Sequence, residues 1–479
     1  MARTDARGLT LAARKDAAAS APLRSVPAPA IAVLALDQGR GRAARPVVRV
    51  GDAVRVGTRV ADADDASVAA LHAPVAGRVI AIEERPTPTG TGPCIVIEND
   101  GSDAREREPE ALDWAALEPA ALVAALRDAG VAGLGGAAYA TAAKLDAART
   151  RAAGHLLLNG AECEPWICCD DALMRARAVD VIEGARVLMH ATGATRCSIA
   201  IEDDKPEAIA AMQAAIDVAA DLRCTLVTLP TRYPAGAEGP LVAALTGTEV
   251  PRGGHPPDVG ALCHNVGTAA AVAAAVRGDP VVRRIVTVTG SGVVAPANLE
   301  ARLGTPIADL VAACGGYADA PLRLIAGGSM MGRALDTDDV PVTHALSCAL
   351  VATAGDLVPR GREYACIRCG DCADVCPPGL LPQQLLRGLL AGDEATLARH
   401  GLADCIECGC CDYVCPSAIP LTTRFRAARA DARARDAARR QSDDLRARHA
   451  RHVARLAAEA EAERRAFEAA RQLARGRKD

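Results

Sequence analysis

The chain contains CIRCGDCADVCP at residues 366–377 and CIECGCCDYVCP at residues 405–416, two copies of the spacing Cys-x2-Cys-x2-Cys-x3-Cys-Pro. This is the bacterial pattern for [4Fe–4S] clusters, in which three thiolates of one tight loop reach three irons and the fourth cysteine ligates the other cluster. The spacing therefore predicts two clusters. The expected ligand sets are Cys366, Cys369, Cys372 and Cys415 for the first cluster, and Cys405, Cys408, Cys411 and Cys376 for the second.

A pair of structural zinc sites is the alternative interpretation, because zinc also binds paired Cys-x2-Cys steps. Zinc takes four ligands, and it has no use for the third cysteine and the proline of each copy. Cys410 stands beside Cys411 outside the pattern, and we expect it to be packed rather than to bind iron. Two adjacent clusters indicate a relay of single electrons.

The size and composition of the chain exclude several classes of function. With 479 residues it has room for three or more domains. Its net charge of -4 gives no electrostatic case for a nucleic-acid partner. Eight of its eighteen cysteines lie in the two motifs, and the others show no framework spacing, which is typical of a reducing compartment.

The first 29 residues are rich in Ala, Arg and Pro, and we expect a disordered lead that is neither a signal peptide nor a membrane anchor. The longest apolar run, Thr268–Val276, is far too short to span a bilayer. Any association with a membrane would therefore be through partner subunits.

Residues 31–98 are predicted to form short strands, among them Val47–Val50, Val54–Val56 and Val79–Ile82, with glycine turns between them. The segment His72–Val79 resembles the hairpin of lipoyl and biotinyl barrel-sandwich domains. A carrier domain needs a lysine at the hairpin tip, and this hairpin has none. The module is therefore expected to be structural or to serve as a docking surface.

From Glu110 onward the pattern alternates between helix and strand, which predicts an α/β layer domain. A helix is expected over Trp114–Asp128, then the glycine loop Gly133–Tyr139, a helix over Ala140–Thr150 and a strand over His155–Asn159. The loop does not match Gly-x-Gly-x-x-Gly and follows a helix, so an ordinary dinucleotide fingerprint is excluded.

Glycines before a helix let backbone N–H groups approach an anion. Lys144, one of only four lysines in the chain, lies early in the following helix and is a candidate phosphate ligand. A plain turn and a solvated lysine are the simpler alternatives. Glu164 and Glu238 lie in later loops and are candidate acceptors for ribose hydroxyls, with ordinary surface carboxylates as the alternative.

Two further units follow. A strand from Ile285, a helix over Pro306–Cys314 and a strand over Arg323–Ala326 predict a small β-grasp insertion. Residues 422–479 are charged, lack proline and predict one long helix, whose large apolar residues are too sparse for a coiled coil. These apolar residues are Val453, Leu456, Phe467 and Leu473.

The order of these features resembles the RnfC (RsxC) proteins of the Rnf (Rsx) ion-translocating electron transport complex over about residues 30–425. The matching stretches are Val47-Val48-x-Val50-Gly51-Asp52, His72-Ala73-Pro74-Val75-x-Gly77, Gly133-Leu134-Gly135-Gly136-Ala137, Asn159-x-Ala161-Glu162-Cys163-Glu164-Pro165, Ala244-Leu245-Thr246-Gly247-x-Glu249-Val250-Pro251-x-Gly253-Gly254, Gly327-Gly328-x-Met330-Met331-Gly332 and the double cysteine motif. The middle part is also similar to the NADH-binding flavoprotein subunit of complex I, which binds FMN and carries a β-grasp insertion called SLBB.

The resemblance implies a set of cofactor residues. For FMN they are Gly135, Gly136, Lys144, Asn159, Glu162, Cys163, Tyr233, Gly236 and Asn265, and for NADH they are Tyr139, Glu164 and Glu238. The chain departs from the family where Ala138-Tyr139-Ala140-Thr141 replaces Gly-Phe-Pro-Thr, where Ala237-Glu238-Gly239 lacks a lysine, and where Ser329 replaces a proline. The added methyl groups at Ala138 and Ala237 are expected to crowd the nucleotide. No side chain is expected to act as a catalytic acid or base.

The expected architecture is multidomain, α/β and α+β. It comprises a disordered lead (1–29), a barrel-sandwich domain (30–105), a Rossmann-like α/β domain for FMN and NADH (106–284), an SLBB β-grasp domain (285–345), a helical two-cluster ferredoxin-type domain (346–425) and a charged helical tail (426–479).

The resemblance implies a peripheral subunit on the cytoplasmic face of the bacterial inner membrane, active only within the complex. It would pass electrons between NAD(H), FMN, two [4Fe–4S] clusters and other Rnf subunits, with ferredoxin or quinone-side carriers as indirect partners. The alternatives are a soluble flavoprotein subunit of an NADH-linked hydrogenase or formate dehydrogenase, and a non-catalytic iron–sulfur adaptor.

Overall fold

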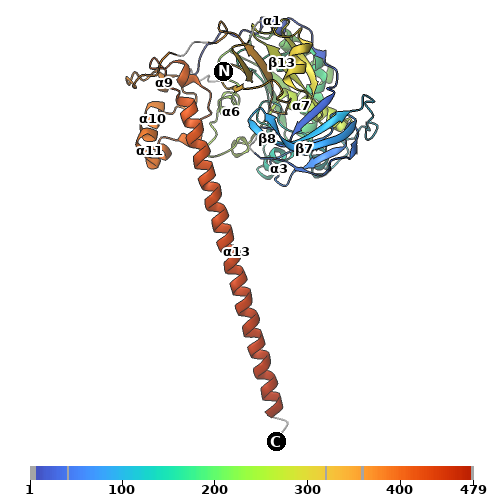
Figure 1. Cartoon of the computed structure of the whole chain (residues 1–479), viewed down its shortest axis with the longest axis vertical. Coiled ribbons are helices and arrows are strands. Elements are labelled where there is room, and N and C mark those ends of the chain that lie inside the picture. The colour runs from blue at the N-terminus through green and yellow to red at the C-terminus, as the bar shows by residue number, and fades with distance from the viewer. Residues whose placement is uncertain (1–6, 40–41, 319–320, 358–360, 476–479) are drawn as a thin grey trace. The chain divides into compact units, whose positions relative to one another are not determined.

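A computed structural model describes residues 7–39, 42–318, 321–357 and 361–475, with side chains as far as residue 472 (Figure 1). The chain divides into two compact units. The first comprises Met1–Gln383 with Asp404–Ile419, and the second comprises Gln384–Ala403 with Pro420–Asp479. The first unit contains three β-containing domains and both cysteine motifs, and the second is helical.

The N-terminal barrel-sandwich domain is built from two small antiparallel sheets, drawn in blue in Figure 1. One sheet has the order β2 (Ile31–Ala35), β8 (Gly90–Asn99), β7 (Gly77–Thr87) and β4 (Ala53–Val54), and the other has the order β3 (Arg45–Pro46), β5 (Arg59–Asp62) and β6 (Leu71–His72). The first residue of β7 must be Gly77, because a Cβ atom there would overlap the carbonyl oxygen of Glu98 in β8. The predicted strand Val47–Val50 is wrong: Val47 and Val50 are exposed, so this valine run has no sheet face to cover.

The disordered lead is a second correction, since residues 7–29 are ordered. Here α1 (Asp16–Ala19) is followed by β1 (Arg24–Ser25), which adds a parallel edge strand to the sheet of the β-grasp domain. Leu9 exchanges two backbone hydrogen bonds with Tyr233. Composition alone missed these elements because their partners lie more than 200 residues away in sequence. Residues 1–6 lie outside the described residues.

The α/β domain has a four-stranded parallel sheet, as the helix–strand alternation predicted. Its strands have the order β11 (Cys224–Leu229), β10 (Arg196–Glu202), β9 (His155–Gly160) and β12 (Ala261–Asn265). Its helices are α2 (Pro119–Asp128), α3 (Thr141–Thr150), α4 (Cys169–Thr192), α5 (Pro206–Ala219), α6 (Glu238–Thr246) and α7 (Val266–Val276). The first helix begins at Pro119 rather than Trp114, since proline is favoured in the first helical turn.

A mixed six-stranded sheet forms the β-grasp domain. Its order is β1, β14 (Ala297–Arg302), β13 (Arg283–Thr289), β17 (Cys348–Ala352), β15 (Arg323–Ala326) and β16 (Arg333–Leu335), and it is accompanied by α8 (Ile307–Ala313). The predicted boundary at residue 345 is wrong, because β17 pairs with both β13 and β15 inside the sheet. Buried residues of this domain and of the barrel-sandwich domain form one continuous hydrophobic core.

The two cysteine motifs fold into the same local shape. In each, a left-handed residue (Arg368 or Glu407) precedes the second cysteine, and a left-handed glycine (Gly370 or Gly409) follows it. A one-turn helix comes next, α9 (Asp371–Asp374) or α12 (Cys410–Tyr413), and these two helices lie against each other.

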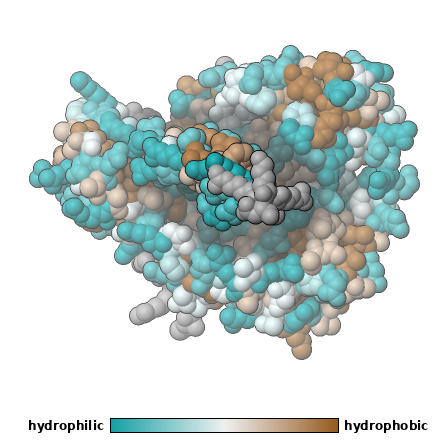
Figure 2. Space-filling model, turned by 90° about the horizontal axis from the view of Figure 1, so that it is seen from below, coloured by the Kyte–Doolittle hydropathy of each residue, from teal (hydrophilic) through white to brown (hydrophobic). Residues whose placement is uncertain are grey.

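The second unit contains α10 (Pro382–Ala391), from residue 384 onward, α11 (Glu394–Arg399) and α13 (Leu421–Arg475). The long helix predicted for the tail is confirmed as α13, the red helix of Figure 1. Its residues Leu445, Val453, Leu456 and Phe467 are exposed, as expected of a solvated helix, and the side chain of Leu473 lies outside the described residues. In Figure 2 hydrophilic residues cover most of the visible face and hydrophobic residues form separate patches. Among the described helices none has the length and apolar character needed to cross a membrane.

Candidate cofactor sites

The glycine loop between α2 and α3 is fixed at its ends and exposed in its middle. The Gly133 N–H donates to the carbonyl of Tyr139 at 2.8 Å, and the Leu134 N–H donates to Thr268 Oγ1 at 2.9 Å. Between these anchors Gly135, Gly136 and Ala137 are exposed. At Gly136 φ is +92° and no heavy atom lies within 4 Å of a built Cβ position, so the backbone there is open to an approaching group.

Lys144 lies in the first turn of α3, beside this loop. Its Nζ donates to Glu238 Oε1 at 2.7 Å and to the carbonyl of Cys263 at 3.0 Å. Burial by itself would lower the pKa of Lys144, but the charge of Glu238 outweighs it and the pKa is raised. The ammonium group of Lys144 therefore stays protonated and is held in place near the start of a helix. A positive charge at a helix N-terminus favours the binding of an anion. The exposed glycine backbone and this charge fit the phosphate end of a flavin nucleotide.

The turn after β9 holds the next group of predicted flavin residues. Asn159 Nδ2 donates to the Gly236 carbonyl at 2.8 Å, and Gly236 packs so closely on Ala161 and Cys163 that a side chain would be crowded there. Burial raises the pKa of the Cys163 thiol to about 12, so it stays protonated. Cys163 can therefore pack against a cofactor but cannot serve as a thiolate base.

Glu162 caps the start of α4. Its carboxylate accepts hydrogen bonds from the Asp170 N–H at 2.7 Å and from the Asp171 N–H at 3.1 Å. Asn265 caps α7 by accepting from the Gly267 N–H at 2.8 Å, and its Nδ2 donates to Asp170 Oδ2 at 2.6 Å. The predicted residues Glu162 and Asn265 are thus joined through Asp170.

Asp170 and Lys15 contact predicted flavin residues and are candidates that sequence reasoning missed. Burial, with the charge of Glu162, raises the pKa of Asp170 to about 7. Lys15 is buried, and its Nζ donates to the backbone carbonyl of Glu162. The scarcity of lysine that draws attention to Lys144 applies equally to Lys15. The composition of the segment around Lys15 favours a disordered lead instead. The contact between Lys15 and Glu162 therefore could not be predicted from the sequence.

The three residues expected to contact NADH lie in three different surroundings. Glu164 Oε1 accepts hydrogen bonds from the Met330 and Met331 N–H groups at 2.7 and 2.9 Å, across to the β-grasp domain. Burial raises the pKa of Glu164. Glu238 is paired with Lys144, and Tyr139 is half-buried at the end of the glycine loop. Ala138 is buried, so its methyl group lies away from the exposed part of the loop.

Tyr233 reaches the second cysteine motif. It is 2% exposed, and its hydroxyl donates to the Cys408 carbonyl at 2.6 Å. Burial raises the pKa of the tyrosine far above its usual value, so the hydroxyl stays protonated. Gly236, three residues later, contacts Cys163. One short segment therefore touches both the predicted flavin residues and the predicted iron ligands.

Two of the predicted iron ligands, Cys376 and Cys372, interact electrostatically with other motif cysteines. Burial raises the pKa of Cys376 to about 12, and the charges of Cys408 and Cys405 contribute, so the last cysteine of the first motif lies near the second motif. Burial also raises the pKa of Cys372, and the charges of Cys369 and Cys366 contribute. The place of Cys376 is compatible with a fourth ligand that serves the other cluster, and the two full ligand sets stay a prediction. Cys410 is completely buried, as expected for a packed cysteine.

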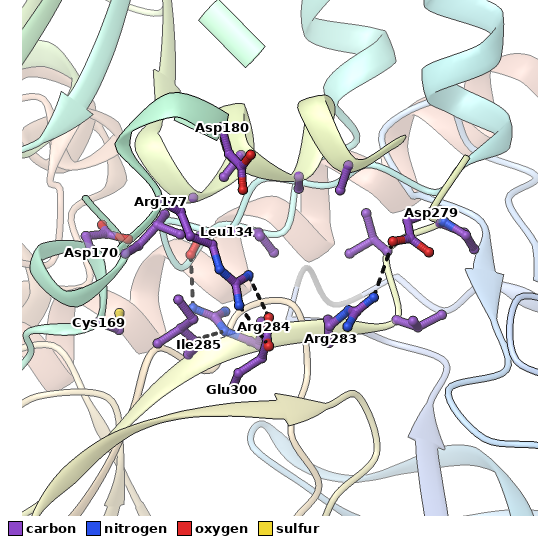
Figure 3. A pocket seen from close by; sticks show the side chains of 18 of the residues that line it. Leu134, Cys169, Asp170, Arg177, Asp180, Asp279, Arg283, Arg284, Ile285 and Glu300 are labelled. Atoms are coloured by element: carbon purple, nitrogen blue, oxygen red, sulfur yellow. Dashed lines mark hydrogen bonds and ion pairs between the residues drawn. The ribbon is translucent and has the colours of Figure 1, made fainter. Parts of the chain in front are cut away.

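A cavity of about 280 Å³ lies between α4, α7 and β13, where Leu134 of the glycine loop forms part of its wall (Figure 3). Arginines and carboxylates alternate around it and neutralise each other: Arg177 binds Glu300 through two hydrogen bonds of 2.8 and 2.9 Å, and Arg283 pairs with Asp279. Arg284 donates to the Leu134 carbonyl and so supports the loop from below. The volume is just under the range of roughly 300–1,000 Å³ usual for ligand pockets, and none of the predicted flavin residues lines it.

Comparison with known proteins agrees with this division into domains. Residues 4–102 match the RnfC barrel-sandwich hybrid domain, 126–274 the Nuo51 FMN-binding domain, 285–334 the SLBB domain and 365–419 the 4Fe-4S dicluster domain. The RnfC protein of the ion-translocating oxidoreductase complex of Rhodobacter capsulatus is 40% identical, over 85% of this chain and 79% of its own length. The chain belongs to the RnfC family of ion-translocating oxidoreductase complexes.

Other members of the RnfC family are longer. The relative from Pseudomonas aeruginosa is 45% identical over 89% of this chain but only 55% of its own length, so the chain spans little more than half of that relative. A crystal structure of an NAD+-reducing [NiFe]-hydrogenase is 21% identical with a TM-score of 0.47, covering 66% of this chain and 62% of the hydrogenase chain. The matched domains assign FMN and [4Fe–4S] clusters to this family member, as the sequence predicted.

Proposed function

We propose that this chain is the peripheral electron-input subunit of a membrane-bound Rnf-type complex. It passes electrons between NAD(H) and two [4Fe–4S] clusters through FMN, and hands them to other subunits in the membrane, where transfer is coupled to ion movement. The chain lies on the cytoplasmic face of the inner membrane and is active only within the complex. Ferredoxin or quinone-side carriers are its indirect partners.

The observation that carries this proposal is the direct contact between the two predicted cofactor sites. Tyr233 bonds to the second cysteine motif, and Gly236 packs on Asn159 and Cys163 of the predicted flavin wall. Electron transfer between a flavin and a cluster requires such proximity. Bound FMN exchanges a hydride with a nicotinamide and single electrons with iron–sulfur clusters.

The chain's own residues bind and position the cofactors. The exposed N–H groups of Gly135 and Gly136 and the charge of Lys144 bind the phosphate. Asn159, Glu162, Cys163, Tyr233, Gly236 and Asn265 form the rest of the flavin site, and Tyr139, Glu164 and Glu238 contact the nicotinamide nucleotide. The iron ligands are Cys366, Cys369, Cys372 and Cys415 for one cluster, and Cys405, Cys408, Cys411 and Cys376 for the other.

Anaerobic purification followed by iron, flavin and NADH measurements tests this function. We expect about eight irons and one FMN per chain, with flavin and cluster absorbance bleached by NADH. Eight irons without FMN would indicate an electron adaptor instead. Bleaching by NADH in a chain that does not assemble with membrane partners would indicate a soluble hydrogenase-type or formate dehydrogenase-type flavoprotein.

Replacing Lys144 tests the phosphate site directly. A charge-assisted hydrogen bond contributes roughly 1.5–3 kcal/mol, so Lys144→Gln should weaken FMN binding by about 10- to 150-fold. Fluorescence quenching during titration of flavin-free protein with FMN gives the affinity. Arg149→Gln, on the same helix, is the matched control and should leave the affinity unchanged. Equal affinities for all three proteins would exclude Lys144 from the site.

A further inference from the structure

The long helix α13, labelled in Figure 1, is packed at its start and exposed beyond it. Leu421 and Phe425 are 2% and 1% exposed, and Arg429 donates to the Ala403 carbonyl at 3.2 Å. Every described side chain from residue 443 to residue 472 is exposed. A helix in water is stabilised mainly by the packing of one of its faces. The exposed length of α13 therefore leaves a face free for a partner.

This helix carries a positive charge, although the whole chain has a net charge of -4. Residues 421–456 contain eleven arginines, four aspartates and no lysine or glutamate, which gives a net charge of +7. Residues 457–475 contain four arginines and four glutamates, and their charges cancel. The basic segment, which we define as residues 445–456 (LRARHARHVARL), has four arginines and no acidic residue. The positive charge therefore lies in the first two thirds of the helix and is undiluted in the basic segment.

Acidic residues on either side of the basic segment neutralise it only weakly. Arg446 pairs with Asp443 at 3.6 Å, and Arg455 pairs with Glu459 at 3.7 Å. All four side chains are exposed. Ion pairs of this kind in water contribute little, because solvent screens them and both side chains lose conformational freedom. The charge of the segment is therefore available to an anionic partner.

The large apolar residues of the basic segment lie on one face of the helix. With about 100° between successive residues, Leu445, Val453 and Leu456 project within an arc of about 80°. Their side chains are 58%, 49% and 49% exposed, and Phe467, which is 70% exposed, lies within the same arc further along the helix. The four arginines of the segment project outside this arc. An apolar face bordered by arginines is typical of a helix that lies in the interface of a bilayer, because long arginine side chains reach back to the headgroups.

An anionic bilayer fits this face better than a nucleic acid or a second copy of the helix. A nucleic acid would bind the arginines through its phosphates, but it would leave the apolar residues beside them exposed to water. A second copy of the basic segment, paired side by side with the first, would place arginines against arginines, and like charges in contact are destabilising. A bilayer with anionic lipids supplies phosphates for the arginines and acyl chains for the apolar face together.

We propose that the basic segment of α13 binds directly to the surface of a bilayer that contains anionic phospholipids. Leu445, Val453 and Leu456 enter the headgroup region toward the acyl chains, and the arginines bind lipid phosphates. The segment lies along the surface, and no helix in the described part of the chain is able to cross the bilayer. This contact goes beyond the proposed function, in which the chain reaches the membrane through other subunits, and gives the chain a membrane attachment of its own.

Flotation of the reconstituted full-length chain with vesicles tests the proposal. We expect the chain to float with vesicles of phosphatidylcholine and phosphatidylglycerol in equal parts, and to stay at the bottom with vesicles of phosphatidylcholine alone. Raising the ionic strength from about 0.1 M to about 1 M shortens the Debye length from about 10 Å to about 3 Å, so most of the bound chain should be released. Equal flotation with both kinds of vesicle, or flotation with neither, would overturn the proposal.

A charge variant measures the contribution of the arginines. It combines Arg446→Gln, Arg448→Gln, Arg451→Gln and Arg455→Gln. An arginine close to an anionic surface strengthens binding by about fivefold, so the partition coefficient of this variant should fall by about 100-fold or more. The matched control removes the same number of charges at exposed positions of the first unit and should keep wild-type binding. It combines Arg49→Gln, Arg55→Gln, Arg107→Gln and Arg323→Gln.

An apolar variant keeps the net charge and combines Leu445→Gln, Val453→Gln and Leu456→Gln. Its partition coefficient should fall by about tenfold or more, because three large apolar side chains no longer enter the bilayer. Glutamine is a good helix former, and circular dichroism checks that the helix is retained. The matched control replaces exposed apolar residues of the α/β domain and combines Val179→Gln, Val218→Gln and Leu222→Gln. Wild-type affinity of either the charge variant or the apolar variant for the anionic vesicles would overturn the proposal.

The other two partners give distinct results. Binding of a single-stranded RNA that anionic vesicles fail to displace would overturn the proposal in favour of a nucleic acid. A dimer in light scattering that the apolar variant abolishes, without flotation, would overturn it in favour of a second copy. None of these measurements uses NADH, FMN or another subunit. A chain that floats but is not bleached by NADH would refute the proposed function alone, and a chain that is bleached but does not float would refute the lipid contact alone.

Discussion

Asp170 lies among polar and charged groups from four parts of the first unit. Glu162 faces it from the turn after β9, Asn265 from the start of α7, Arg284 from β13 and Lys15 from the N-terminal segment. Burial and the Glu162 charge raise the pKa of Asp170 to about 7, against an unfolded value of roughly 3.9. Its ionisation therefore costs free energy in the folded protein. Below about pH 4 this group is protonated in both the folded and the unfolded state, and the free energy of unfolding falls as the pH rises from there through about 7.

We therefore expect Asp170→Asn to alter the pH dependence of stability. Asparagine keeps an oxygen for the Asn265 amide but cannot ionise, so the variant should lose less stability than the wild type between pH 4 and pH 8. One pKa unit corresponds to about 1.4 kcal/mol, so the rise in the pKa of Asp170 to about 7 sets an upper limit of about 4 kcal/mol on the difference. Denaturant unfolding of both flavin-free proteins across this range measures it. Asp309→Asn, an exposed carboxylate of α8, is the control. Parallel pH profiles for the wild type and Asp170→Asn would contradict the prediction.

Among the secondary-structure elements, α4 and α7 pack with their backbones in close approach. Gly184 of α4 faces Ala269 of α7, and a built Cβ atom at Gly184 would overlap the Ala269 carbonyl. Glycine is disfavoured inside a helix by roughly 1 kcal/mol relative to alanine, so its presence here reflects the packing. Glu162 accepts a hydrogen bond from the first turn of α4, and Asn265 caps α7. The distance between the two helices therefore affects where these predicted flavin residues lie.

Gly184→Ala should therefore destabilise the α/β domain by about 1–3 kcal/mol, the usual cost of overpacking a core. Gly239→Ala in α6 provides the matched control, because nothing lies within 4 Å of a Cβ atom there and the change should be neutral or stabilising by up to about 1 kcal/mol. Urea unfolding curves of both variants give these free energies. A stable Gly184→Ala protein would show that the helices can separate without loss.

The molecule as a whole combines one large unit with a smaller helical one. Most of α13 beyond residue 440 has exposed side chains as far as residue 472. A solvated helix contributes little to the stability of a packed domain, since it buries almost no apolar area. We therefore expect any role of the part beyond residue 440 to come through what it binds.

Deleting residues 440–479 should lower the helical signal at 222 nm without changing the main unfolding transition by more than about 2 °C, because no core residue is lost. Calorimetry and circular dichroism of the reconstituted chain measure the two quantities together. A shorter deletion of residues 473–479 controls for the new chain end. A fall of many degrees in the main transition would mean that the helix stabilises the packed units.

The amino-acid sequence alone was enough to predict the chemistry of the clusters and most local structure. A cysteine spacing is a local property, so the two motifs could be recognised directly, and β15 was predicted to the residue. The valine run at 47–50 was misread because β-propensity depends on a sheet face to cover, and the boundary at 345 was misplaced because β17 pairs with distant strands.

Which distant groups meet depends on the tertiary structure. The contact of Tyr233 with Cys408, the link from Lys15 to Glu162 and the pairing of Lys144 with Glu238 each join residues 94 to 175 positions apart. Neither hydrophobic periodicity nor residue spacing in the sequence predicts such pairs, because they depend on how the domains pack. That packing also makes one cysteine motif buried and the other exposed, although their loop conformations are alike.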